Sequence, residues 1–537
     1  MSSEPAGLTV ATARDARESA LLDRAFTRAA GAPLVAGNGV RVLKNAAENY
    51  PAWLEAIHSA RQKIYFENYF IVDDPTGREF AAALAEKARA GVLVRLVYDW
   101  MGSFHKASRS FWRGLTDAGV QVRCFNPLRF ASPLQVLHRD HRKMLAVDGR
   151  VGFVTGLCVG NLWVGDPSRG IEPWRDTGVE VRGPALSDIE RAFAQVWNAC
   201  GGGHIDAAEL TVRESVAEAG DVPLRIVANA PGTTGIFRLD QLIAAAARRT
   251  LWLTDAYFAG VPPYVQALRA AALDGVDVRL LVPGASDIPI LRPLSQAGFR
   301  PLLEAGIRVF EWKGSMLHAK TAVADGRWAR VGSSNLNIAS WVGNYELDAV
   351  IEHEATAATM EQMFLADLDN SREIVLQPRR RRYLDLVSDR SEAALGETDL
   401  AQGERRRPDP VDEGPRDSMR GRRGSASRAA AGALRLGRAV GAALTEQRVL
   451  AHTEARVVAI VGVLLVAIVV IGAIWPFVIA VPIGIVLLWM AISLFIRAHT
   501  LRKERRSQGL PATRVSRAAP GAPDPARPQP ERRRESQ

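Results

Sequence analysis

Two copies of one short pattern hold the residues of this 537-residue chain that are best suited to chemistry. His141, Lys143 and Asp148 are spaced as His-x-Lys-x₄-Asp, and the spacing returns in His318, Lys320 and Asp325. One imidazole can attack phosphorus while the other protonates the departing oxygen, and two ammonium groups can neutralise the phosphate oxygens. The duplicated pattern therefore predicts one shared site for covalent chemistry on a phosphodiester, without a metal ion or other cofactor.

The segments that must position these residues also occur twice. The matching pairs are 64–70 with 251–258 and 91–97 with 275–281. Each half reads as an apolar strand, a helix (80–90 or 265–273), a strand, a helix and then the strand that bears the pattern. This alternation is expected of a parallel sheet covered by helices. We therefore predict an α/β fold with two duplicated lobes, 33–210 and 211–385, which follow an N-terminal segment of residues 1–32.

The second copy continues into a longer signature. After Asp325 and six further residues come Gly332 and Ser333, and Asn335 completes His-x-Lys-x₄-Asp-x₆-Gly-Ser-x-Asn. This signature is similar to that of the phospholipase D superfamily. The first copy departs from it, because Cys158 stands where the family has Asn. The resemblance implies two phospholipase D-type lobes, each with a mixed or parallel sheet flanked by helices.

Two acidic segments also resemble the bacterial cardiolipin synthase branch of that superfamily. They contain Asp176 and Glu346, and in that branch such segments supply a carboxylate to each catalytic His. A carboxylate on the far ring nitrogen would fix the tautomer of the imidazole and stabilise the imidazolium. We therefore expect Asp176 and Glu346 to orient the two histidines, with solvated acidic side chains as the alternative.

The resemblance also suggests roles for the two histidines and their neighbours. The family most often uses the first His as nucleophile, so His141 is the expected nucleophile and His318 the general acid and later the base; the reverse assignment stays open. Lys143 and Lys320 lie two residues after each His, so along a strand they would project on the same face as the His. With Asn335, they are expected to bind the phosphate group.

Other residues near the patterns are expected to be structural. Asp148 and Asp325 close the catalytic motif at the strand ends, where we expect them to face away from the cleft and brace the turn. Cys158 is expected to be a small buried residue. Tyr69 and Tyr257 end corresponding strands and are expected to pack in the core rather than line a headgroup pocket.

Composition favours a cytoplasmic catalytic body. The chain is 47% apolar, which permits a large buried core, and it has only three Cys. A sparse and odd set of Cys favours a reducing compartment without a disulfide framework. The first residues also lack the basic region and apolar run of a cleaved signal peptide.

A long apolar stretch near the end of the chain predicts membrane attachment. Residues 457–496 contain no charged side chain and would form about 60 Å of helix, twice the thickness of a hydrocarbon core. Pro476 and Pro482 interrupt the stretch, so we predict two transmembrane helices, 457–475 and 478–496, within residues 451–500. Basic residues flank both ends, which places both ends in the cytoplasm. This predicts a multi-pass protein of the plasma membrane (cell inner membrane), with its catalytic body on the cytoplasmic side.

The segments around this hairpin are polar and basic. Residues 386–450 are predicted to form a partly disordered linker with a basic amphipathic helix, and residues 501–537 a disordered basic tail. The net charge of +10 is concentrated in such tails, so the expected partner is an anionic phospholipid membrane and not a nucleic acid. The sequence does not predict the oligomeric state.

Taken together, the residues and the resemblance predict a membrane-anchored phosphatidyltransferase of the cardiolipin synthase type. The resemblance implies phosphatidylglycerol as donor, a phosphatidyl-His141 intermediate and a second phosphatidylglycerol as acceptor. Phosphatidylethanolamine or a small alcohol would use the same machinery. The alternatives are a phospholipase D hydrolase that releases phosphatidic acid, a nuclease of the same superfamily, and an inactive membrane scaffold.

Overall fold

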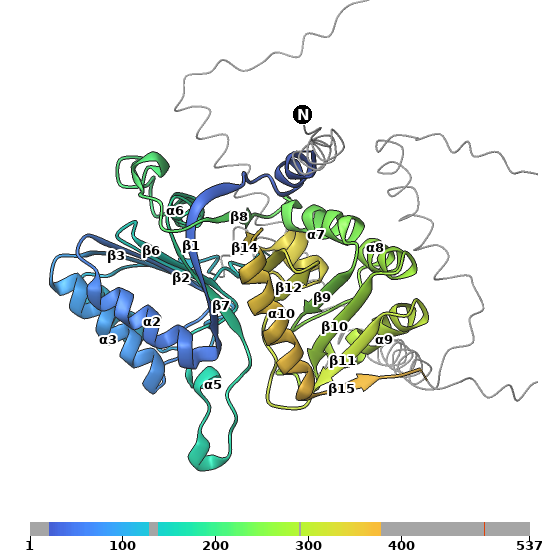
Figure 1. Ribbon diagram of the computed structural model, residues 1–537. Coiled ribbons are helices and arrows are strands. Elements are labelled where there is room, and N and C mark those ends of the chain that lie inside the picture. Colours follow the sequence, from blue (N-terminus) through green and yellow to red (C-terminus); the bar gives the residue numbers. More distant parts are fainter. Residues whose placement is uncertain (1–20, 128–137, 289–290, 377–487, 489–537) are drawn as a thin grey trace, which may run out of the picture. The chain divides into compact units, whose positions relative to one another are not determined.

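The computed structural model describes residues 21–127, 138–288 and 291–376 and Leu488, and its strands join into one 15-stranded sheet (Figure 1). The strands of the first lobe are β1 (Val35–Lys44), β2 (Lys63–Asn68), β3 (Leu93–Asp99), β4 (Gln121–Phe125), β5 (Met144–Val147), β6 (Val151–Thr155) and β7 (Thr177–Arg182). Those of the second lobe are β8 (Val222–Asn229), β9 (Thr250–Thr254), β10 (Asp277–Pro283), β11 (Arg308–Trp312), β12 (Thr321–Ala324), β13 (Trp328–Gly332), β14 (Glu346–Ile351) and β15 (Ser371–Ile374).

Helices connect these strands in the same order in both lobes. The α-helices are α2 (Asn45–Ser59), α3 (Pro75–Arg89), α4 (Arg109–Asp117), α5 (Asn161–Val164), α6 (Leu186–Ala199), α7 (Gly235–Ala246), α8 (Pro262–Leu273), α9 (Leu291–Glu304) and α10 (Glu354–Asp369). Short 3₁₀ turns are η2 (Pro167–Arg169) and η3 (Arg213–Ser215), and η4 (Ala339–Gly343) is a π-helical turn.

The helices α3 and α8 cover the predicted helices 80–90 and 265–273 but begin earlier. Asp74 caps α3 by accepting a hydrogen bond from the backbone N–H of Gly77 (2.9 Å). Pro75 and Pro262 occupy the first helical turn, where a missing N–H costs nothing and the fixed φ favours the helix. The capping residues, rather than the apolar periodicity, therefore set where these helices start.

The sheet is mixed, which is one of the two forms that the resemblance implied, and the parallel arrangement expected from the alternation of strands and helices is present only in part of it. Strands β2, β3 and β4 are parallel to one another, as are β9, β10 and β11. The strands within the two patterns, β5 and β12, instead run antiparallel to β2 and β9. A short turn leads from β5 to β6, and antiparallel neighbours can be joined in this way, whereas parallel strands need a long crossover.

These directions bring many loops to one edge of the sheet, which we call the catalytic edge. Because β5 is antiparallel to β2, its start lies beside the carboxyl end of β2, and the same holds for β12 beside β9. The ends of β6 and β13 and the starts of β7 and β14 reach this edge as well, since each pair is antiparallel. The two patterns begin at this edge, and the segments that carry Asp176 and Glu346 lie there too.

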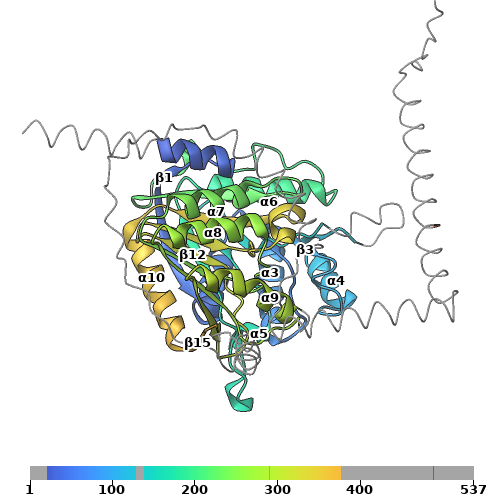
Figure 2. The same cartoon turned by 90° about the vertical axis from the view of Figure 1, so that its right-hand side faces the viewer.

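Three apolar clusters hold the lobes together. One draws on both lobes, with Val154 and Val179 in the same cluster as Val331 and Leu347, and includes residues of α6 and α10. A second cluster packs α2 and α3 on the first lobe, and a third packs α7, α8 and α9 on the second lobe. Figure 2 shows α7, α8 and α9 side by side over the second lobe. The shared cluster means that the two lobes are packed as one body.

The N-terminal end of the described chain contacts both lobes. A helix over residues 21–30 places Phe26 and Ala30 in the apolar cluster of the second lobe. Strand β1 then pairs with β8 of the second lobe on one side and with β7 of the first lobe on the other. Strand β1 is thus the strand that joins the two halves of the sheet.

The predicted transmembrane helices, 457–475 and 478–496, lie outside the described residues apart from Leu488, as do the linker 386–450 and the tail 501–537. Within the described ranges, no helix has both the length and the apolar character that a bilayer crossing requires.

Candidate active site

Each pattern is attached by its backbone to the opposite lobe. The backbone N–H of His141 donates to the carbonyl oxygen of Tyr345 (3.0 Å), and that of His318 donates to the carbonyl oxygen of Arg175 (2.7 Å). Parallel bridges at Asp140 with Tyr345, and at Arg175 with Leu317, extend the two junctions. The two lobes therefore meet at the catalytic edge through a symmetric exchange of backbone hydrogen bonds.

The side chains of the two histidines follow the same exchange. His141 Nδ1 lies 2.9 Å from Glu346 Oε2, and His318 Nδ1 lies 2.7 Å from Asp176 Oδ2. An ionised carboxylate can only accept, so a neutral ring must carry its proton on Nδ1 and keep the lone pair on Nε2. Each lobe thus supplies one imidazole and the carboxylate that orients the other imidazole.

Each carboxylate has a further donor, and the donors differ between the lobes. Ser333 Oγ donates to Glu346 Oε2 (2.5 Å), whereas Trp163 Nε1 donates to Asp176 Oδ2 (3.0 Å). The position that matches Ser333 in the first lobe is Gly156, where an added Cβ would lie 2.2 Å from Asp176 Oδ1. A serine does not fit there, and the indole of α5 provides the second hydrogen bond instead.

Both lysines are buried beside the histidines and bend back on the chain. Lys143 Nζ donates to the carbonyl oxygen of His141, and Lys320 Nζ donates to that of His318. Their ammonium groups also lie over the rings of Tyr69 (5.1 Å) and Tyr257 (5.6 Å). Strands β5 and β12 begin one residue after each lysine. The strand alternation used to predict the lysine directions therefore does not apply at these positions.

The environment keeps both imidazoles neutral in the substrate-free protein. Burial, followed by the charge of Lys320, lowers the pKa of His318 to about 3 despite Asp176. Burial likewise lowers the pKa of His141, against the opposing charge of Glu346 and with the help of Lys143 and Lys320. Because both lysines act on both imidazoles, the two patterns share one electrostatic site.

The orienting carboxylates stay ionised although they are fully buried. Burial alone would raise the pKa of Asp176 and of Glu346. Interactions with His318, Lys320 and Trp163 together outweigh burial and lower the pKa of Asp176, and those with His141, Lys143 and Ser333 do the same for Glu346. An ionised carboxylate is the form that can hold the Nδ1 proton in place.

A pH dependence follows from Lys320. Burial lowers the pKa of Lys320 to about 8, so its ammonium form is present below that pH and is lost above it. We expect the decline of kcat/KM with rising pH to become steeper above about 8, because the neutral amine cannot stabilise charge on a phosphate. The corresponding change in kcat should occur at higher pH, because a bound phosphodiester anion favours the ammonium form of Lys320.

The variant Lys320→Arg provides the control in a pH–rate series. Arginine keeps its charge over this range, so the kcat/KM of this variant should show no steeper decline above pH 8, whereas Lys143→Arg should retain it. An identical steeper decline in Lys320→Arg and in the wild type would assign the titration to another group.

The last residues of the two patterns lie at the opposite edge of the sheet. Asp148 accepts hydrogen bonds from the backbone N–H groups of residues 61–63, each at 2.8 Å. Asp325 accepts from those of residues 248–250, at 2.7 to 3.0 Å. Both aspartates have a φ of 54°, a left-handed conformation that Asp tolerates better than most residues. Their contacts suit a turn brace, and neither carboxylate contacts a pattern histidine.

These contacts predict a loss of stability without a loss of chemistry. Asp148→Ala and Asp325→Ala each remove the acceptor of three backbone N–H groups, which should cost about 2–3 kcal/mol of unfolding free energy. Asn should cost less, because its amide oxygen still accepts and it tolerates positive φ. The denaturation midpoint should be highest for the wild type, lower for the Asn variants and lowest for the Ala variants. Under conditions well below the midpoint, kcat of each variant should stay within about twofold of the wild-type value. A drop in kcat at an unchanged midpoint would instead assign these residues to the chemistry.

The first and second copies differ most at Cys158 and Asn335. Asn335 is buried, and its side-chain oxygen has no hydrogen-bond partner in the part of the chain that the structure describes. Cys158 is buried, as expected, and burial raises the pKa of its thiol although Lys143 and Lys320 oppose this. Both positions therefore lie close to the charges of the site, and only Asn335 offers an amide there.

Several positioning residues were not identified from the sequence. Arg142, between His141 and Lys143, is fully buried and donates to the carbonyl oxygens of Glu346 (3.1 Å) and Asn229 (2.7 Å) in the other lobe. Arg175 forms a buried ion pair with Asp367 of α10 (2.8 Å). Arg142 stands in a run of charged and polar residues, 138–143, so its sequence neighbours do not single it out. No local signal identifies its partners, because they lie some 50 to 200 positions away.

A buried pair of carboxyl groups lies next to the first pattern. Glu67 near the end of β2 and Asp140 before His141 are both fully buried. Burial raises the pKa of Asp140 to about 7, although Glu67 and Arg142 oppose this. Burial and the charge of Asp140 raise the pKa of Glu67. Burial and the repulsion between two neighbouring carboxylates therefore favour a protonated form of the pair near neutral pH.

Tyr69 and Tyr257 are at the site as well as against the core. The ring of Tyr69 lies edge-on to His141 with centroids 5.1 Å apart, and that of Tyr257 lies edge-on to His318 at 5.8 Å. Tyr69 also packs against the apolar cluster of the first lobe. The prediction of core packing is thus incomplete, because the same rings restrict the motion of the two imidazoles.

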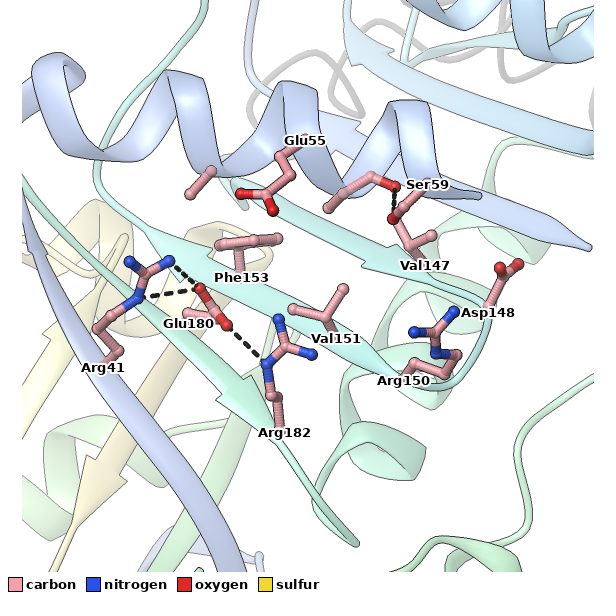
Figure 3. A pocket seen from close by; sticks show the side chains of 12 residues that line it. Arg41, Glu55, Ser59, Val147, Asp148, Arg150, Val151, Phe153, Glu180 and Arg182 are labelled. Atoms are coloured by element: carbon pink, nitrogen blue, oxygen red, sulfur yellow. Dashed lines mark hydrogen bonds and ion pairs between the residues drawn. The ribbon is translucent and has the colours of Figure 1, made fainter. Parts of the chain in front are cut away.

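A hollow of about 190 Å³ lies at the other edge of the sheet (Figure 3). It is bordered by Arg41 and Arg182, which both bind Glu180, and by Asp148 at the turn. None of the four pattern histidines and lysines lines it. This hollow is therefore not the candidate active site.

In the described ranges, no group of three or more His, Cys, Asp or Glu is placed to hold a metal ion.

Comparison with known proteins identifies relatives that match about two thirds of the chain. The family described as "Cardiolipin synthase, PLD-like domain" matches residues 53–161 and 239–368. The chain is 32% identical over 366 residues to the cardiolipin synthase of Halalkalibacterium halodurans, covering 67% of this chain and 72% of that relative. It is 34% identical over 362 residues to cardiolipin synthase A of Pseudomonas fluorescens, covering 66% of this chain and 74% of that relative.

A solved structure has a similar fold. The phosphatidylserine synthase of Haemophilus influenzae superposes with a TM-score of 0.50 at 14% identity, covering 69% of this chain and 96% of that chain. At this identity the likeness concerns the fold. It agrees with the two-lobed α/β architecture predicted from the repeated segments.

Proposed function

Since the chain belongs to the cardiolipin synthase family of the phospholipase D superfamily and is an enzyme of that type, we propose that it moves a phosphatidyl group from one phosphatidylglycerol to another. One observation carries the proposal. Two imidazoles, each held at Nδ1 by a carboxylate of the other lobe, lie in the field of the same two buried lysines. This arrangement suits a double displacement at one phosphorus.

In the first step, His141 Nε2 attacks the phosphorus of the donor lipid. A P–N bond forms and the P–O bond to the headgroup glycerol breaks, while His318 Nε2–H protonates the departing glycerol oxygen. Free glycerol leaves and the phosphatidyl group remains on His141. Glu346 supports this step because it keeps the reactive lone pair on Nε2 and stabilises the positive charge that forms on the ring.

In the second step, a hydroxyl group of another phosphatidylglycerol attacks the same phosphorus. His318, now neutral, accepts the hydroxyl proton at Nε2, the new P–O bond forms and the P–N bond to His141 breaks. The products are cardiolipin and the free enzyme. Asp176 supports both steps because it stabilises the protonated form of His318 each time that it appears.

The acid must gain its proton when substrate binds. The pKa of His318 is about 3 in the substrate-free site, since burial and Lys320 disfavour the imidazolium. A phosphodiester anion offsets the charges of Lys143 and Lys320, so its arrival raises the pKa of His318. The lysines and Asn335 then bind the phosphate oxygens as charge develops, a role in which one fixed donor is worth about 3 kcal/mol.

We further propose that the chain is attached to the cell inner membrane by the helical hairpin of residues 457–496, with its catalytic body on the cytoplasmic side. The absence of charge over these residues and the basic residues that flank them support this placement. The hairpin would hold the catalytic edge near a lipid substrate.

The product mixture tests the reaction. The purified full chain, supplied with phosphatidylglycerol that is radiolabelled in its headgroup glycerol, should form labelled cardiolipin and release labelled glycerol in equal amounts. Phosphatidic acid with glycerol, and no cardiolipin, would show that water resolves the intermediate and would refute the transferase proposal. Adding a small alcohol as a competing acceptor shows which hydroxyl group the second step uses.

A further inference from the structure

We infer that the loops around the catalytic edge form a membrane-docking rim that inserts into the surface of a phospholipid bilayer. The rim consists of Met101, Phe104, Leu162, Val164, Ile338 and Val342. The inference rests on the proposed function, because only a lipid substrate requires the catalytic edge to reach the headgroup layer. It adds a second membrane contact, made by the catalytic body itself and independent of the hairpin.

The rim residues are large apolar side chains that remain exposed. Their exposed fractions run from 39% at Val342 to 60% at Ile338, and Phe104 is 52% exposed. Single exposed apolar side chains are common on soluble proteins, but a group gathered at one site marks an interaction surface. These six come from both lobes, which favours a surface that serves the shared site.

Strand directions place the rim at the catalytic edge. Met101 and Phe104 follow the carboxyl end of β3, Leu162 and Val164 follow β6, and Ile338 and Val342 follow β13. The carboxyl ends of these strands lie at the edge where the patterns begin. The connection that contains α5 extends beyond the sheet (Figure 1).

The rim is built in matching ways by the two halves of the repeat. Trp163 is buried between Leu162 and Val164 on α5, and its ring lies 5.4 Å from that of His318. In the second lobe, Trp341 is buried next to the exposed Val342 on η4. In both lobes, one short helical turn therefore buries an indole and exposes a neighbouring valine.

The neighbourhood of the rim suits an anionic lipid layer. Lys106 lies over the ring of Phe70 (Nζ to centroid 4.0 Å), and His105 and Arg109 are exposed beside Phe104. Apolar side chains flanked by basic ones are typical of segments that lie at the boundary of headgroups and acyl chains, about 5–10 Å deep.

Access to the site also favours a bilayer as the partner. The side chains of His141 and His318 are only 12% and 7% exposed. A two-tailed lipid keeps its acyl chains in the membrane, so its phosphorus can meet these imidazoles only if the catalytic edge enters the headgroup layer. A rim that inserts around the site brings the edge to that depth.

The test uses the full chain in vesicles of equal parts phosphatidylglycerol and phosphatidylcholine. The variant Val164→Ser/Val342→Ser removes one apolar side chain from each lobe at the rim. Its matched control, Val212→Ser/Leu273→Ser, removes two that are 55% and 72% exposed, in the loop before η3 and at the end of α8. We expect the rim variant to lose about tenfold in rate on the bilayer substrate, and the control to stay within about twofold of the wild type.

A short-chain, water-soluble phosphatidylglycerol below its micelle concentration separates docking from chemistry. The rim variant should act on it as fast as the wild type does. An equal loss on the soluble and the bilayer substrate, or no loss on either, overturns the docking proposal.

A readout without catalysis keeps this test apart from that of the reaction. A fluorophore on Val342→Cys should be quenched by brominated acyl chains much more than the same fluorophore on Leu273→Cys. Equal quenching at the two positions overturns the rim. So does a fluorophore at Val342 that becomes shielded in detergent as the protein concentration rises, because a second copy of the chain would then be the partner. Quenching at Val342 in a protein that makes no cardiolipin would retain the rim and refute only the proposed reaction.

Discussion

His141→Ala should abolish phosphatidyl transfer from every donor, whereas the defect of His318→Ala should depend on the leaving group. Loss of the nucleophile removes the covalent route, at a cost of about 10⁴-fold or more. Loss of the general acid costs about 10²–10⁴-fold with phosphatidylglycerol, because an alkoxide is a poor leaving group. With phosphatidyl-p-nitrophenol as donor, a p-nitrophenyl phosphodiester, the departing oxygen needs no proton, so His318→Ala should recover a fast first step.

The measurement is a burst of p-nitrophenol together with mass spectrometry of the quenched protein. His318→Ala should release a stoichiometric burst and accumulate the phosphatidyl group on His141, since the second step still lacks its base. His141→Ala should show neither. A burst in His141→Ala, with the adduct on His318, would establish the reverse assignment of the two imidazoles.

Glu346→Gln and Asp176→Asn should have the next largest effects, although neither residue contacts the substrate in the proposed mechanism. Replacing a carboxylate by an amide removes the charge that stabilises the imidazolium, and the amide N–H can select the wrong tautomer. We expect kcat/KM with phosphatidylglycerol to fall by about 10²–10⁴-fold in each variant. The p-nitrophenyl donor should separate the two variants, since only Asp176→Asn acts through the general acid and should recover its first step.

Ser333→Ala and Trp163→Phe are the matched milder controls. Each removes only the further hydrogen bond to one carboxylate and leaves the carboxylate in place. Their losses should be about tenfold, as expected when a buried hydrogen bond is removed. If Asp176→Asn lost activity equally with both donors, Asp176 would support the architecture of the site and not the acid.

The repeated segments predicted much of the fold. The strands at residues 64–70 and 251–258 and the helices that follow them occur where the pairs of segments place them, because apolar runs and a shared element order are properties of the local sequence. The strands within the two patterns were expected to be parallel and are antiparallel to β2 and β9. A run of four buried residues in β5 or β12 does not indicate its direction, which depends on the length of the connection to its neighbour.

The sequence predicted that a carboxylate orients each histidine, but it did not predict which carboxylate belongs to which histidine. The chemistry of imidazole, ammonium and carboxylate identified candidates one at a time, and the structure places His141 with Glu346 and His318 with Asp176. The roles of Trp163 and Arg142 depend on contacts across the fold, so no local spacing reports them. Strand alternation does not account for the direction of Lys143, because β5 begins only after it.

The exchange of carboxylates between the lobes has a consequence for how such a site can arise. One lobe alone holds an imidazole without its acidic partner, so a single repeat would be complete only in an isologous pair, in which each copy supplies what the other lacks. Fusion of two such copies into one chain frees them from identity. Ser333 in one half and Trp163 in the other show that divergence, and it is what allows one imidazole to specialise in attack and its twin in proton transfer.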